Sequence, residues 1–106
     1  MGGEMRNILS RSRNKDKIIM AEIPSLANEI IKASNGTVSV FEKSGDSILF
    51  QTTINGEGPT FEQASDFTRK LDLCLSERYP GLYETKTIPN DVQHITGYKT
   101  HVKRVK

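Results

Sequence analysis

The sequence predicts an α+β fold, a ferredoxin-like βαββαβ antiparallel sheet with two helices on one face. Three observations predict it: β-branched runs of strand length, two segments with helical periodicity between them, and a short polar link at residues 43–46 that suits a hairpin. An additional strand at the C-terminus can extend this sheet. A chain of 106 residues has the size of one domain.

The first strand and the first helix are expected on either side of Pro24. Residues 15–23 (KDKIIMAEI) have an apolar, β-branched centre of strand length. Pro24 favours a first helical turn, and Asn35-Gly36 suits a left-handed stop, which predicts a helix over residues 24–34. If residues 15–23 do not form a strand, the order becomes αββαββ and the ferredoxin-like prediction fails.

The remaining elements follow from local signals. Residues 37–42 and 47–54 are rich in β-branched and aromatic side chains and predict an antiparallel pair. Thr60 and Gln63 form a capping-box pattern that starts a second helix, and residues 79–81 (YPG) end it. Residues 82–88 and 98–105 predict the last two strands. The expected core is Ile19, Leu26, Ile30, Val38, Val40, Ile48, Phe50, Phe67, Leu71 and Leu75.

Composition favours a reducing intracellular location. The single Cys74 cannot form a disulfide within the chain, and no run of eighteen apolar residues is present to cross a bilayer. The N-terminal residues lack the apolar region of a signal peptide. A cytoplasmic protein without a membrane partner is therefore expected, with residues 1–14 as a flexible basic arm and residues 15–106 as a single α+β domain.

Charge is distributed unevenly along the chain. The net charge of +2 divides into +3 for residues 1–17, −5 for residues 18–94 and +4 for residues 95–106. Basic ends around an acidic centre indicate anionic partners at the ends. The same distribution also allows the ends to pair with the acidic centre of the same chain or of a second copy.

No catalytic or metal-binding pattern stands out, and no cofactor is expected. Cys74 with His94 or His101 offers a thiol and an imidazole, but Cys74 lies on the apolar stripe of the second predicted helix, where an inert core thiol is usual. Asp91, His94 and His101 lack the spacing of a zinc site. The helix N-terminus at Thr60 could hold a phosphate, although a turn and a cap explain the same residues. An enzyme or small-ligand sensor built on Thr60 is the third hypothesis.

Cations alternate near both ends of the chain. On an extended backbone such alternation points several cations in one direction, toward a row of phosphates. The leading hypothesis is therefore a non-enzymatic nucleic-acid-binding protein that contacts the phosphates of DNA or RNA. Its candidate contact residues are Arg11, Arg13, Lys15, Lys17, Lys99, His101, Lys103, Arg104 and Lys106.

Two other interpretations remain open for the basic ends. The chain can be a protein-protein interaction or assembly module, a homodimer or an adaptor or inhibitor of another protein, in which the acidic middle and the basic ends join subunits. Alternatively, charged termini only keep the domain soluble and protect a sheet edge from aggregation. In the last strand, Thr100 and Val102 are expected to face the packed side while Lys99, His101 and Lys103 face solvent. Whether these cations lie beside residues 11–17 would distinguish the interpretations.

Overall fold

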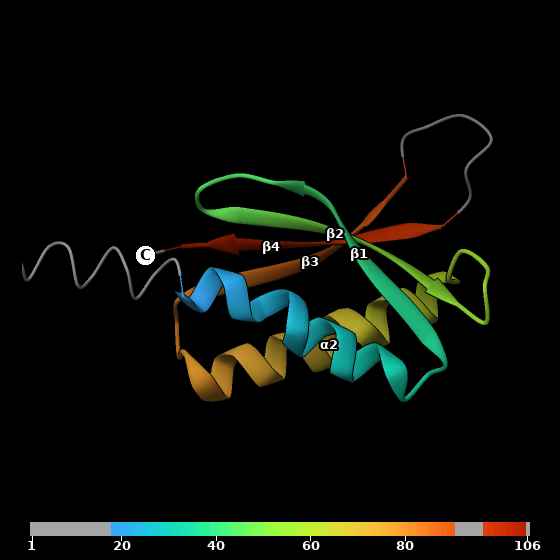
Figure 1. Cartoon of the computed structure of the whole chain (residues 1–106), viewed down its shortest axis with the longest axis horizontal. Helices are drawn as coiled ribbons and strands as arrows, with labels where there is room; N and C mark the ends of the chain where they lie inside the picture. Colours follow the sequence, from blue (N-terminus) through green and yellow to red (C-terminus); the bar gives the residue numbers. More distant parts are fainter. Residues whose placement is uncertain (1–17, 91–96, 106) are drawn as a thin grey trace, which may run out of the picture.

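The computed structural model describes residues 18–90 and 97–105, which form an antiparallel sheet covered by two helices (Figure 1). The strands lie side by side in the order β1-β2-β4-β3. The α+β class and the four-stranded antiparallel sheet are thus confirmed. A helix over residues 18–32 is followed by β1 (Gly36–Lys43), β2 (Ser47–Ile54), α2 (Phe61–Arg78), β3 (Tyr83–Pro89) and β4 (Tyr98–Arg104).

The predicted strand over residues 15–23 is wrong, because residues 18–23 belong to the first helix. Ile19, Ile23 and Ile31 are buried, together with Met20, Leu26 and Ala27, so one apolar face continues across Pro24. A proline inside a helix costs about 3 kcal/mol. Burial of apolar side chains at about 1.5–3 kcal/mol each on both sides of the proline outweighs that cost.

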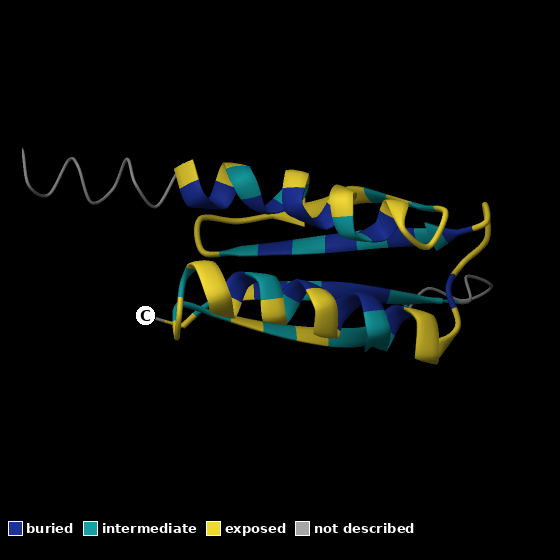
Figure 2. Ribbon diagram, turned by 90° about the horizontal axis from the view of Figure 1, so that it is seen from below, coloured by how far each residue is buried: buried dark blue, intermediate teal, exposed yellow. Residues whose placement is uncertain are grey.

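The ferredoxin-like arrangement is not confirmed, because the described elements follow the order αββαββ. Each half consists of a helix and the hairpin that follows it, and the antiparallel pair of β2 and β4 joins the halves at the centre of the sheet. Both helices lie on one face, the first beside β1 and β2 and α2 beside β3 and β4 (Figures 1 and 2). The opposite face of the sheet carries no helix of the described chain.

The core lies between this sheet and the two helices. Along β2, Ile48, Phe50, Thr52 and Ile54 are buried, and the residues between them are only half-buried. Most of the predicted core is confirmed: Ile19, Leu26, Ile48, Phe50, Phe67, Leu71 and Leu75 are buried, and Ile30 and Val38 pack against them.

Val40 was expected in the core but is 43% exposed. It lies on the edge strand β1, where the register with β2 shifts between Val40 and Glu42. Such a bulge inserts an extra residue and re-aims the side chains around it. The strand alternation that places Val38 against the core therefore does not extend to Val40.

The predicted capping box at the start of α2 is confirmed. The Gln63 backbone N–H donates to Thr60 Oγ1 at 3.2 Å, and the Thr60 backbone N–H donates to Gln63 Oε1 at 2.9 Å. Farther along, the Thr68 hydroxyl lies 2.9 Å from that of Thr100 on β4, and the Thr87 hydroxyl of β3 donates to Thr68 at 2.8 Å. These hydroxyls satisfy one another inside the core and tie α2 to both strands beneath it.

Polar contacts also hold the first helix against the end of α2. Glu22 Oε1 accepts from Arg78 Nη1 at 2.9 Å, and Glu22 Oε2 accepts from Tyr79 Oη at 2.6 Å. The hydrogen bond to Glu22 raises the pKa of the Tyr79 phenol, and burial adds to the rise. Folding therefore favours the neutral phenol.

We expect the Glu22–Tyr79 contact to make stability sensitive to alkaline pH. Because the pKa is higher in the folded chain, the contribution is complete below the unfolded phenol's pKa of about 10 and is lost as pH rises through the folded value. Tyr79→Phe should cost about 1 kcal/mol at neutral pH and flatten this alkaline loss. Urea unfolding of both proteins across neutral and alkaline pH tests it. Equal losses in both proteins would contradict the assignment.

Gly36 at the start of β1 has no room for a side chain. An added Cβ would lie 2.5 Å from the Thr53 carbonyl oxygen and 2.6 Å from Ile31 Cγ1, whereas at Gly45 it would meet no described atom within 4 Å. We expect Gly36→Ala to lower the free energy of unfolding by about 1–3 kcal/mol. Gly45→Ala is the matched control and should change it by less than about 0.5 kcal/mol. Comparable effects in urea unfolding would show that the Gly36 contact relaxes freely.

Candidate nucleic-acid interface

The central strand β4 presents alternate residues to the two faces of the sheet. Thr100 and Val102 are buried against the helices, as the sequence predicts. Lys99, His101 and Lys103 lie on the opposite face, which we call the open face. Three of the predicted contact residues therefore share one surface.

The expectation that Lys99 faces solvent is wrong, because its side chain is buried and the residue is only 8% exposed. Its ammonium nitrogen lies 4.3 Å from the centroid of the Phe41 ring, in cation–π geometry. Phe41 is the residue at the β1 bulge and is itself 56% exposed. Lys99 thus adds positive charge beneath an aromatic ring, while His101 and Lys103 lie farther along the strand.

The strand registers bring four side chains of different chemistry into one line across the open face. Glu42 of β1 pairs with Leu49 of β2, Leu49 pairs with His101 of β4, and His101 pairs with Lys86 of β3. We call Glu42, Leu49, His101 and Lys86 the central row. Since strands lie about 4.8 Å apart, the row spans about 14 Å from its acidic end to its basic end.

The adjacent row adds a second cation at the same end. Ser47 of β2 pairs with Lys103 of β4, and Lys103 pairs with Glu84 of β3. Lys86 Nζ lies 3.9 Å from Glu84 Oε1, and both side chains are largely exposed. An ion pair of that length at the surface contributes little, so it leaves the Lys86 ammonium open to another anion.

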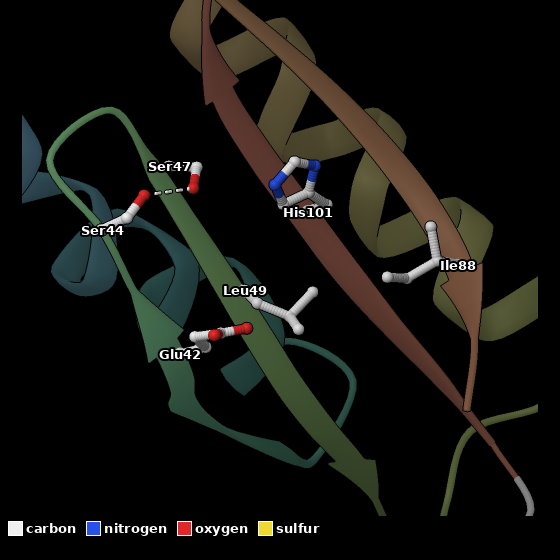
Figure 3. A pocket seen from close by; sticks show the side chains of 6 residues that line it. All are labelled: Glu42, Ser44, Ser47, Leu49, Ile88 and His101. Carbon is white, nitrogen blue, oxygen red and sulfur yellow. Dashed lines mark hydrogen bonds between the residues drawn. The ribbon is translucent and has the colours of Figure 1, made fainter. Parts of the chain in front are cut away.

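Two hollows of the open face meet at His101. The larger, of about 340 Å³, is lined by Glu42, Ser44, Ser47, Leu49, Ile88 and His101. Figure 3 shows these side chains in front of the sheet, with the Ser44–Ser47 hydrogen bond of 2.7 Å at one end and Ile88 at the other. The smaller, of about 220 Å³, is lined by Glu84, Lys86, His101 and Lys103. One side of the imidazole therefore faces mixed apolar and acidic groups, and the other faces two lysines and Glu84.

The other predicted contact residues are placed differently or lie outside the described residues. Arg104 belongs to β4, within the predicted strand over residues 98–105, and is half-buried beside its pairing partner Tyr83. The contact predictions for Arg11, Arg13, Lys15, Lys17 and Lys106 fall outside residues 18–90 and 97–105. The question whether the two basic ends share one surface falls on residues 11–17, outside the described ranges.

Sequence reasoning missed Lys86, Glu42, Glu84 and Phe41 as members of this surface. The alternation of residues 82–88 already places Glu84 and Lys86 on one face of a strand. The alternation does not identify the neighbouring strand, because Lys86 pairs with His101, fifteen residues farther along the chain. Without that register, Lys86 looks like an ordinary exposed lysine.

The catalytic and metal alternatives gain no support from the described chain. Cys74 is partly buried and packs against the core, which fits the structural role expected for it. Among residues 18–90 and 97–105, no three His, Cys, Asp or Glu side chains gather into a metal-binding group. The capping box occupies the first turn of α2 at Thr60. Asp91 and His94 lie outside the described residues.

Comparisons with known proteins leave the open face as the main guide to function. No protein-family model, curated protein or solved structure matches the chain. In the described segments, neither helix is long and apolar enough to cross a membrane.

Proposed function

We propose that the protein is a non-enzymatic nucleic-acid-binding protein that holds phosphates on the open face of its sheet. One observation carries this proposal: Lys86, His101 and Lys103, from two adjacent strands, line the same hollow. A phosphate at that place can reach two ammonium groups and an imidazole at once. Lysine and histidine are side chains that contact phosphates without reading sequence.

The charges around the hollow are arranged for contact along a strand of nucleic acid. Lys99 lies two residues before His101 on the same face, so positive charge continues along β4 beyond the hollow. Its ammonium lies against Phe41, and it acts through its charge at a distance rather than by direct contact. We further propose that Arg104 and the basic side chains of residues 11–17 and Lys106, the latter outside the described residues, add phosphate contacts.

Removal of one phosphate contact should change both affinity and its dependence on salt. Each contact to a single strand contributes about 0.7 to the slope of log K against log salt concentration. We expect Lys103→Gln to weaken binding of a mixed-sequence single-stranded oligonucleotide and to reduce the slope by about this amount. Fluorescence anisotropy over a salt series measures both quantities.

Lys32→Gln is the matched control for this experiment. Lys32 is exposed at the end of the first helix, on the opposite side of the sheet, and the substitution removes the same charge. We expect it to leave the slope unchanged. Equal slopes for wild type and Lys103→Gln would remove Lys103 from the site, and affinity that does not change with salt would overturn nucleic-acid binding.

A second candidate function is self-assembly through the edge strand β1. This strand forms one border of the sheet, and its exposed residues include Val40 and Phe41. An uncovered strand edge with exposed apolar side chains is a template for pairing with another strand. A second copy related by a two-fold axis would pair β1 with β1 and continue the open face across both chains.

This candidate predicts a concentration-dependent dimer that depends on Phe41. Phe61, at the start of α2, is also 56% exposed and lies away from that edge, so it provides a matched control. We expect sedimentation velocity to show Phe41→Ser shifted toward monomer and Phe61→Ser unchanged. Wild type that stays monomeric at all concentrations, or equal effects of both substitutions, would reject assembly through β1.

A further inference from the structure

We propose that the open face selects guanine in a single strand, with the base over His101 and its Watson–Crick edge at the Glu42 carboxylate. This inference rests on the proposed nucleic-acid binding and names the base that it favours. The central row supports this inference, because the Lys86 ammonium and the Glu42 carboxylate stand at opposite ends of a span of about 14 Å. Leu49 and His101, an apolar and an aromatic side chain, lie between them. A nucleotide has the same polarity, a phosphate at one end and polar base edges at the other.

The middle of the row provides a surface for an unstacked base. His101 forms one side of the larger hollow, and the aliphatic side chains of Leu49 and Ile88 form its apolar part (Figure 3). Imidazole rings stack on bases in single-stranded RNA recognition. At about 340 Å³ the hollow is large enough for one base.

Glu42 determines which base fits best at the far end. Its carboxylate makes no hydrogen bond or ion pair with any other described residue, and it lines the larger hollow with Ser44 and Ser47. An ionised carboxylate is an acceptor only and can receive two parallel donors. Guanine alone presents a ring N–H beside an exocyclic amine on its Watson–Crick edge. Cytosine and adenine place an acceptor beside their amine, and thymine and uracil flank their single N–H with carbonyl oxygens.

The position of the acid also has an electrostatic consequence. A carboxylate beside the phosphate path repels nucleic acid unless it accepts hydrogen bonds from the ligand. Glu42 lies on the edge strand β1 and pairs with Leu49 of β2, so β2 separates it from β4. Lys86 and Lys103 line the other hollow. The phosphate therefore belongs at the lysines, and the base extends toward Glu42.

The test uses short thymine oligonucleotides of single-stranded DNA whose central base is guanine, hypoxanthine or adenine. Hypoxanthine keeps the ring N–H of guanine and lacks only the exocyclic amine. We expect wild type to bind the guanine oligonucleotide about tenfold more tightly than the hypoxanthine one, as for a good bidentate contact. Glu42→Gln should reduce this ratio to about one, because the amide replaces one acceptor by a donor.

Glu84→Gln is the matched control, since it makes the same chemical change on the same face at the end of the lysines. It should raise affinity for all three oligonucleotides by a similar factor and preserve the guanine ratio. Circular dichroism checks that both variants fold. A wild-type ratio near one, with affinity that falls as salt rises, overturns guanine selection while nucleic-acid binding stands. A ratio that survives Glu42→Gln overturns the role of Glu42, and no salt-dependent binding to any oligonucleotide overturns both proposals.

Discussion

The pairing of β2 with β4 is the constraint on which the rest of the structure depends. It joins two αββ halves into one sheet, with Phe50 opposite Thr100 at its centre. This register places Ile48 beside Val102 on the helix side and Leu49 beside His101 on the open face. A slip by one residue would turn the apolar residues of one strand to the open face, so burial of the core also fixes the pairing of surface residues.

The core enforces that register with two kinds of interaction. Phe50, Ile48 and Val102 are fully buried and supply apolar contact that is insensitive to direction. Thr100 contributes a directional contact, because its hydroxyl pairs with Thr68 of α2, which in turn accepts from Thr87 of β3. Removing the Thr68 hydroxyl would leave the buried Thr100 hydroxyl without this partner, which costs about 1–3 kcal/mol. The position of β4 between β2 and β3 is thereby specified from both the sheet and the helix.

The sequence predicted those features that depend on neighbouring residues and missed those that depend on distant ones. The capping box at Thr60 and the strand over residues 47–54 follow from local patterns, and both are confirmed. The sequence predicts strand for residues 18–23 because a short apolar run fits the two-residue repeat of a strand as well as the 3.6-residue repeat of a helix. The helical face becomes clear only when the buried residues on both sides of Pro24 are considered together. Glu42 and Lys86 could not be joined to His101 from the sequence, because that needs three strand registers and the bulge at Phe41.

The mixed charge of the open face bears on what kind of binding it can support. A surface that relied on phosphate attraction alone would gain affinity from every added lysine and lose it with every acid. Here Glu42 and Glu84 stand on the same face as Lys86 and Lys103, and the two acids have different surroundings. Glu84 lies against the lysines and moderates their field, whereas Glu42 faces a hollow that is lined by no lysine or arginine. An acceptor in that setting lowers affinity for ligands that cannot donate to it, and specificity arises from such a difference between ligands.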